Sequence, residues 1–223
     1  MASIFPIVII FANAPLSRPP DLLNRIKQAD LIIAADGGAN HCLALGIVPD
    51  VLLGDLDSIE PGVLQKCQET GAAIHRYPER KNATDLELSL DFALEKGAEK
   101  VWLLGGHGGR WDMSLATIML AASEKYRALG ITLLGADCSM KILHPGTLHR
   151  FTGCVGGTVS FLPLKGDSSG ITLSGFEYPL TNYAIPFGST RGISNIVQSD
   201  MATEQHDSGI LLCVQLIKDD NEG

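Results

Sequence analysis

The stretch Val51-Leu52-Leu53-Gly54-Asp55-Leu56-Asp57-Ser58 joins a short apolar run to two aspartates through a single glycine. A run of this length that ends at a turn residue is typical of a buried strand. Upstream, Leu31–Ala35 is followed directly by Asp36 in the same way. In an open parallel α/β sheet the carboxyl ends of the strands share one edge, and ligands bind in the crevice there. The acids of both stretches are therefore expected to meet at one site.

The same strand-then-loop pattern extends over residues 1 to about 135. Apolar runs that predict strands occupy residues 7–11, 31–35, 51–53, 73–75, 101–104 and 131–134. Amphipathic stretches between them predict helices at 21–29, 39–45, 61–70, 84–96 and 112–129, several of them closed by a glycine in the C-cap position. This alternation predicts an α/β fold with a mostly parallel sheet flanked by helices.

The second part of the chain has a different character. After Cys138 the helical period disappears, and short runs rich in Thr, Val, Ile and Phe are separated by Gly, Pro, Asn and Ser. Strands are predicted at 158–164, 170–173, 183–187, 195–198 and 209–217. We therefore expect an α/β domain over residues 1–137, followed by a smaller all-β sandwich domain over residues 138–223.

Charge and hydropathy exclude two classes of partner. The formal net charge is −8, from 17 Lys and Arg against 25 Asp and Glu. No Lys/Arg run is long enough to follow a nucleic-acid backbone or an anionic membrane surface. No apolar segment approaches the length needed to span a membrane. The sequence therefore predicts neither nucleic acid nor a membrane as a partner.

The cysteines and the N-terminal segment indicate the compartment. The five cysteines are scattered and lack Cys-x-x-Cys spacing, so neither a disulfide framework nor a zinc site is expected. The apolar stretch 4–14 follows Met1-Ala2-Ser3, which carries no Lys or Arg. A first buried strand is the preferred interpretation over a signal peptide. These features predict a protein of the reducing cytoplasm.

The acidic motifs suit a divalent cation. Asp55 and Asp57 can both reach one octahedral ion while leaving positions for water and phosphate oxygens. The competing interpretation is a turn in which Asp57 or Ser58 caps the helix that begins near Pro61. Thr84-Asp85-Leu86-Glu87 reads as a capping box, and Asp85 can still project into the crevice. Lys81, just before it, either contacts phosphate or is solvated.

A glycine-rich loop, Gly105-Gly106-His107-Gly108-Gly109-Arg110, follows the strand predicted at 101–104. Closely spaced glycines let the backbone approach a phosphate and direct N–H groups at it. Arg110 can bind phosphate oxygens in a bidentate way, and Asp112 can take the N-cap of the next helix or face the site. The loop matches neither a Walker motif nor Gly-x-Gly-x-x-Gly.

Taken together, these motifs resemble the thiamine pyrophosphokinase family in order and spacing. The matching residues are Ala35-Asp36-Gly37-Gly38-Ala39, Pro49-Asp50 with Gly54-Asp55-Leu56-Asp57-Ser58, Thr84-Asp85, Gly108-Gly109-Arg110-Trp111-Asp112, Gly175-Phe176-Glu177-Tyr178-Pro179-Leu180, Phe187-Gly188 and Ser194-Asn195. Any one of these motifs is modestly specific, whereas the ordered set spans most of the chain and is highly specific.

The resemblance implies an ATP- and Mg²⁺-dependent diphosphotransferase. ATP would give its diphosphate to the hydroxyethyl group of thiamine, which releases AMP. The domain 1–137 would bind ATP and Mg²⁺, and the domain 138–223 would bind thiamine and contribute to a homodimer. In that family thiamine lies between the α/β domain of one subunit and the β domain of the other.

Each predicted site residue has a role in this scheme. The predicted metal ligands are Asp55, Asp57 and Asp85. The predicted catalytic residues are Asp36, Asp85, Arg110 and Asp112. The residues predicted to bind phosphate are Lys81, Gly106, Gly108, Gly109 and Arg110, while the resemblance places Ser194 and Asn195 beside thiamine.

Several alternatives stay open from the sequence. Ala14, Asn82, Met113 and Ile196 stand where the family commonly has Gly, an acid, His and, in bacterial members, Glu. The acceptor could therefore be another alcohol such as a hydroxymethylpterin. Asp55-Leu56-Asp57 would also suit a metal-dependent glycosyltransferase, and a non-catalytic vitamin- or nucleotide-binding homologue is a further alternative.

Overall fold

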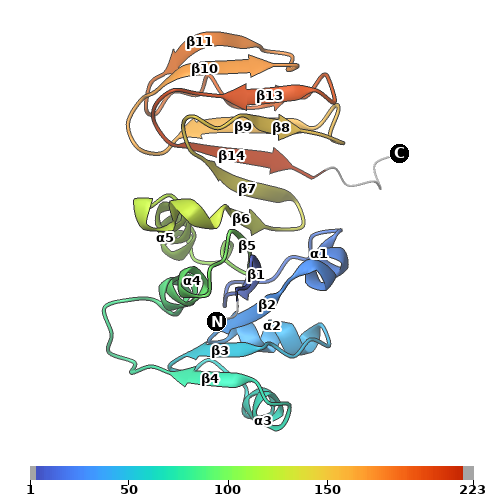
Figure 1. The fold of residues 1–223 in the computed structure, drawn as a ribbon, viewed down its shortest axis with the longest axis vertical. Helices are drawn as coiled ribbons and strands as arrows, with labels where there is room; N and C mark the ends of the chain where they lie inside the picture. The colour runs from blue at the N-terminus through green and yellow to red at the C-terminus, as the bar shows by residue number, and fades with distance from the viewer. Residues whose placement is uncertain (1–3, 218–223) are drawn as a thin grey trace. The chain divides into compact units, whose positions relative to one another are not determined.

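The computed structural model describes residues 4–217. The chain divides into two compact units, residues 1–135 and 136–223. Figure 1 shows helices and strands alternating along the first unit and strands dominating the second. Within residues 4–217, no helix has both the length and the apolar character needed to cross a membrane. All five cysteines are free, and the cytoplasmic location stays a prediction.

A parallel sheet forms the first unit, as predicted. Its strand order is β6-β5-β1-β2-β3-β4, and every neighbouring pair runs parallel. The strands are β1 (Ile7–Phe11), β2 (Leu31–Ala35), β3 (Val51–Gly54), β4 (Ala73–Arg76), β5 (Lys100–Leu104) and β6 (Ile131–Leu134). The central strand β1 is buried along most of its length because helices cover both faces of the sheet. The apolar stretch near the N-terminus is thus a core strand, as expected.

The helices divide between the two faces of this sheet. Buried residues of α1 (Leu22–Gln28), α2 (Gly38–Ala44) and α3 (Pro61–Glu69) share one apolar cluster with Ile9, Phe11 and Leu52 of the strands. Figure 1 shows α4 (Asp85–Glu95) and α5 (Trp111–Ala121) on the other face. The loops that lead from the strands into α2, α4 and α5 all start at the carboxyl edge of the sheet.

The predicted single helix at 112–129 is wrong, because the chain breaks there. Helix α5 ends at Ala121, and a short 3₁₀ helix, η1 (Glu124–Leu129), follows. The buried Tyr126 of η1 donates a hydrogen bond from its hydroxyl to Asp91 Oδ1 of α4 at 2.7 Å. This contact with a distant helix accompanies the break, and no glycine or proline in the sequence signals it.

The second unit is a sandwich of two antiparallel sheets, also as predicted. The sheets have the orders β12-β9-β14-β7 and β11-β10-β13-β8. Phe151, Phe161 and Phe176 meet edge to face in its core, with ring centroids 5.3–5.9 Å apart. The strands are β7 (Cys138–Leu143), β8 (His149–Phe151), β9 (Thr158–Pro163), β10 (Ser168–Ser174), β11 (Leu180–Ile185), β12 (Asn195–Ile196), β13 (Ala202–Gln205) and β14 (Leu211–Leu216).

Three of these strands, β7, β8 and β13, lie outside the ranges that were predicted from the sequence. Strand β13 has polar residues in the core, which hides its pattern. Glu204 is fully buried, and its Oε1 lies 2.8 Å from Nδ1 of the buried His206. The two side chains are hydrogen-bonded to each other, which offsets part of the cost of burial, while Glu204 Oε2 and His206 Nε2 have no hydrogen-bond partner. A hydrophobic pattern search cannot detect a strand of this kind.

Candidate active site

A cavity of about 570 Å³ opens at the carboxyl edge of the parallel sheet. It is lined by the loops that follow β1, β2, β3, β4 and β5, by the first turn of α4 and by the first two turns of α5. The residues of these loops are distant in sequence, and the sheet brings them together. Its lining residues include Asn13, Asp36, Asp55, Lys81, Thr84, Asp85, Gly105, Gly106, Gly108, Gly109, Arg110, Met113 and Thr117.

Three carboxylates form a compact cluster at this edge. Asp36, Asp55 and Asp57 each offer an oxygen, and these atoms all lie within 4.8 Å of one another. Asp36 is 7% exposed, and its buried Oδ1 has no hydrogen-bond partner. A buried, unpartnered carboxylate oxygen beside other acids is costly unless a cation binds it. The donor set therefore fits a hard divalent cation such as Mg²⁺.

The backbone at Asp36 is shaped by its glycine neighbours. Asp36 has φ +47, and its N–H donates to Leu53 O at 2.7 Å. Gly54 has φ +145, and a Cβ there would lie 3.0 Å from Asp36 Cβ, so glycine is favoured at this close approach of the two loops. A left-handed conformation in a non-glycine residue costs about 1 kcal/mol or more, and such strain clusters at functional sites.

Lys81 joins two acids of the cavity. Its Nζ lies 3.1 Å from Asp55 Oδ2 and 2.9 Å from Asp85 Oδ1. The hydrogen bond from Lys81 lowers the pKa of Asp55. Burial raises the pKa of Asp85 and outweighs the opposing effect of Lys81. Burial alone would lower the pKa of Lys81, but the two carboxylates raise it overall. Lys81 therefore stays charged and supplies positive potential inside an acidic site.

Asp85 lies at the start of α4, where the predicted cap is present. Thr84 is the N-cap residue, and its Oγ1 accepts a hydrogen bond from the Glu87 N–H at 3.1 Å. The oxygen of Asp85 that faces Gly54 is the one paired with Lys81. The cluster of acids thus contains Asp36 together with Asp55 and Asp57, whereas Asp85 is bound to Lys81.

The alternative of an Asp57 or Ser58 cap on α3 is wrong. The N-cap of α3 is Glu60, which makes no side-chain cap bond. The Glu60 N–H is bound by Asn40 Oδ1 of α2 at 3.1 Å. Asp57 is exposed, and its Oδ1 accepts a hydrogen bond from Ser58 Oγ at 3.0 Å. Asp57 is therefore free of a capping role.

The glycine-rich loop after β5 needs its glycines for close packing. A Cβ on Gly105 would lie 2.4 Å from Ala12 O, and one on Gly106 would lie 2.9 Å from Leu103 Cδ2. Gly108 and Gly109 have φ +99 and +68. The Gly108 N–H donates to Ser114 Oγ at 3.0 Å, so that amide is already used inside the protein.

Arg110 reaches the cavity, whereas Asp112 does not line it. The Arg110 Nε and Nη2 donate to the two oxygens of Asp112 at 3.1 and 2.5 Å. This hydrogen-bonded pair lowers the pKa of Asp112. Arg110 itself is the N-cap residue of α5, so the expectation of Asp112 as the N-cap is wrong. Asp112 thus contacts the guanidinium of Arg110.

Ser194 and Asn195 lie in the second unit. The Asn195 side chain is buried and bridges to the Tyr178 backbone, with Oδ1 and Nδ2 each 2.9 Å from its partner. Those bonds tie β12 to the loop before β11. Ser194 is exposed with φ +56, and its N–H donates to Ser160 Oγ at 3.0 Å.

The site also contains residues that the sequence motifs do not predict. Asn13 lines the cavity and packs against Gly37, where a Cβ would lie 2.1 Å from Asn13 Oδ1. His41 of α2 also supports this edge, because its Nε2 lies 2.9 Å from Ala14 O in the loop after β1. Asn13 follows a strand, as the acids do, which is a signal that could have found it.

Comparison with known proteins supports a single family. The family model described as "Thiamin pyrophosphokinase, catalytic domain" matches residues 22–133, and "Thiamin pyrophosphokinase, vitamin B1 binding domain" matches residues 148–211. The thiamine pyrophosphokinase of Bacillus subtilis (strain 168) is 33% identical over 206 residues, which are 92% of this chain and 96% of that protein. A crystal structure of thiamine pyrophosphokinase from Bacillus subtilis matches with a TM-score of 0.83 at 32% identity, over 95% of this chain and 99% of that one.

A shorter match concerns a different acceptor. The 6-hydroxymethyl-7,8-dihydropterin pyrophosphokinase of Pyrococcus furiosus is 30% identical over 127 residues, 54% of this chain and 53% of that protein. The match covers about half of each chain.

Proposed function

The chain belongs to the thiamine pyrophosphokinase family, and we propose that it transfers a diphosphate group from ATP to the hydroxyethyl group of thiamine, which gives thiamine diphosphate and AMP. The observation that carries this proposal is the cluster of Asp36, Asp55 and Asp57 beside the cavity at the carboxyl edge of the sheet. A volume near 570 Å³ lies within the range of about 300–1,000 Å³ that is usual for small-molecule sites.

Asp36, Asp55 and Asp57 would hold Mg²⁺, which supplies charge neutralisation for the phosphate oxygens when it is bound. The support is the unpartnered Oδ1 of Asp36 and the closeness of the three carboxylates. Asp85 would act beside this cluster, because Lys81 links it to Asp55.

Positive charge from the chain itself would bind the polyphosphate. Of the described residues that line the cavity, Lys81 and Arg110 are the cationic ones. A guanidinium has five N–H donors, and two of those of Arg110 go to Asp112. The remaining donors can face an anionic ligand while Asp112 holds the group in place. Transfer of a phosphoryl group depends mainly on positioning and charge neutralisation, which these residues would provide.

One experiment tests the reaction directly. Protein, ATP, Mg²⁺ and thiamine are mixed, and the products are identified by mass. AMP and thiamine diphosphate are expected in equal amounts. ADP would instead indicate transfer of a single phosphate, and ligand-induced stabilisation without AMP would indicate a non-catalytic binding protein.

A pterin alcohol is the second candidate acceptor, favoured by the match to the Pyrococcus furiosus enzyme. The same assay with 6-hydroxymethyl-7,8-dihydropterin in place of thiamine separates the two. Faster AMP release with the pterin would replace the thiamine assignment and leave the ATP chemistry intact.

We also propose a homodimer that uses the outer side of α5. Trp111, Leu115 and Met119 recur every four residues, so they lie along one side of the helix. They are 81%, 54% and 70% exposed. An exposed apolar stripe of this kind is typical of a protein interface, and the same helix lines the cavity through Met113 and Thr117.

Leu115→Glu tests this interface. A carboxylate buried in an apolar contact is costly, so the variant is expected to be a monomer at micromolar concentration, whereas the wild type has the mass of a dimer by light scattering. Leu23→Glu is the matched control, because Leu23 is an exposed leucine of α1. A monomeric wild type, or a Leu115→Glu variant that remains dimeric, would contradict the proposal.

A further inference from the structure

Ser114 binds the glycine-rich loop from inside α5. Its Oγ donates a hydrogen bond to Arg110 O at 3.0 Å and accepts one from the Gly108 N–H at 3.0 Å. The residue is 8% exposed, and it does not line the cavity. One hydroxyl therefore joins two residues that do line it.

Ser114 holds the loop backbone at Gly108, where side-chain packing does not hold it. The N-cap residue, Arg110, makes no side-chain cap bond at the start of α5. Gly108 has φ +99, and a Cβ there would meet nothing within 4 Å, so side-chain packing does not hold it at that point. A glycine has large conformational freedom, and the Ser114 hydroxyl restricts it. The Arg110 carbonyl also accepts the Ser114 N–H at 3.1 Å, so the backbone of Arg110 is held twice by the same residue.

We propose that Ser114 is a positioning residue for nucleotide binding, which acts by fixing Gly108 and Arg110 in the arrangement that receives the polyphosphate. This inference rests on the proposed function. It has one chemical consequence: the Gly108 amide is occupied by Ser114, so the phosphate contacts predicted for the loop fall to Gly106, Gly109 and the Arg110 side chain.

Ser89 provides a matched control within the same unit. It is a buried serine of α4, and its Oγ donates to Asp85 O, four residues back, at 2.8 Å. Ser114 makes the same bond to the carbonyl four residues back, and in addition it binds a loop amide. Comparing the two serines therefore separates the loop contact from the ordinary effect of losing a buried hydroxyl.

The test uses the full-length protein with Ser114→Ala, Ser114→Thr and Ser89→Ala. Hydrogen exchange of the 105–110 segment is measured without ligand, and binding of Mg²⁺ with α,β-methylene-ATP, which cannot release AMP, is measured by calorimetry. Ser114→Ala is expected to exchange the Gly108 amide faster and to weaken nucleotide binding by roughly 5- to 10-fold, the usual effect of one lost hydrogen bond. Ser114→Thr, which keeps a hydroxyl, should restore most of the affinity, and Ser89→Ala should leave it unchanged.

The outcomes are distinct. If Ser114→Ala binds the analogue as the wild type does, the positioning role is refuted, whatever the exchange data show. If Ser89→Ala weakens binding equally, the effect is general destabilisation and the inference is also refuted. If the wild type does not bind the analogue at all, the proposed function fails first and this inference fails with it.

Discussion

Asp57→Asn is expected to slow AMP formation by about 10²- to 10³-fold, which corresponds to the several kcal/mol that a bound metal ion contributes to charge stabilisation. Asp57 is exposed and belongs to the cluster with Asp36 and Asp55. Its Oδ1 accepts a hydrogen bond from the neighbouring Ser58, and an asparagine oxygen can accept the same bond. The substitution therefore removes a charge from the cation site with little effect on the fold. Initial rates of AMP release at several Mg²⁺ concentrations measure the effect.

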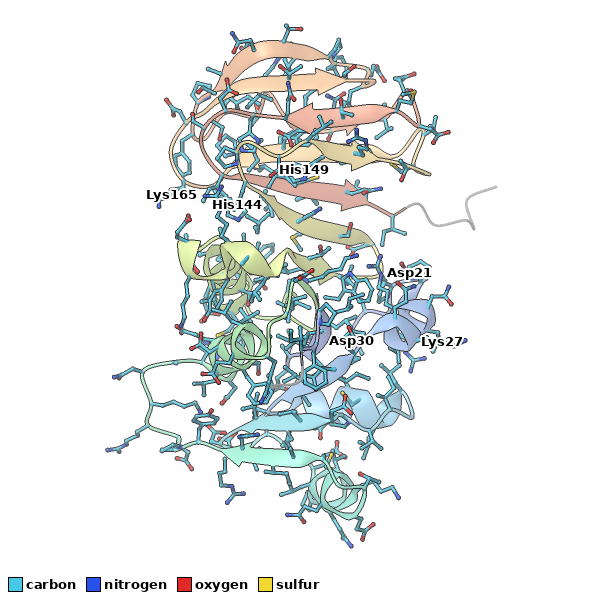
Figure 2. The ribbon with its side chains drawn as sticks, in the orientation of Figure 1. Asp21, Lys27, Asp30, His144, His149 and Lys165 are labelled. Atoms are coloured by element: carbon cyan, nitrogen blue, oxygen red, sulfur yellow. The ribbon has the colours of Figure 1, made fainter. Side chains whose placement is uncertain are left out.

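Asp21→Asn is the matched control for this prediction. Asp21 lies at the start of α1 (Figure 2), and it pairs with Arg25 at 2.6 Å. It is neither part of the acid cluster nor a lining residue of the cavity. The control removes one negative charge from the same unit and should leave AMP release unchanged. Near-normal turnover of Asp57→Asn at saturating Mg²⁺ would show that Asp57 is not a metal ligand.

Gly38→Ala is expected to cost about 3 kcal/mol or more in the free energy of unfolding of the first unit, because it forces two packed elements apart. Gly38 is the first residue of α2, and it is buried against β1. An added Cβ would lie 2.0 Å from Phe11 O and 2.6 Å from Phe11 C. Phe11 is fully buried in the central strand, and these are backbone atoms, so no side-chain rotation relieves the clash. Urea denaturation followed by circular dichroism measures the loss.

Gly62→Ala is the control, since it adds the same methyl group to another helix of the same unit. Gly62 is the second residue of α3, and a Cβ there would meet nothing within 4 Å. Alanine is a better helix former than glycine, so this variant should gain about 0.5–1 kcal/mol. Equal stabilities of the two variants would show that α2 does not pack against β1 closely enough to exclude a side chain at Gly38.

Much of the first unit could be predicted because its signals are local. Strands β1, β2 and β5 are apolar runs bounded by turn residues, and parallel strands buried on both faces have this appearance. This pattern therefore predicts that Asp36 and Asp55 meet at one edge of the sheet. The break between α5 and η1 could not be predicted, because it coincides with the contact of Tyr126 with Asp91, 35 residues away.

The second unit is harder to predict because apolar and polar residues alternate along its strands and some of the buried residues are polar. Strand β13 buries Glu204, which is paired with the buried His206. Asn195 was assigned to the thiamine pocket by resemblance alone. In the structure its amide bonds the Tyr178 backbone, a partner 17 residues away that no local pattern reveals.

The α/β order, the β sandwich, the family and the edge at which the acids gather can all be predicted from residue order, because they follow from short-range periodicity and from ordered motifs. The folded structure sets how the charged groups pair: Asp36 joins Asp55 and Asp57, while Lys81 contacts both Asp55 and Asp85. It also decided that Ser114 would bind Gly108. Such choices depend on distances of a few ångströms between loops that are far apart in the chain, and residue order does not encode those distances locally.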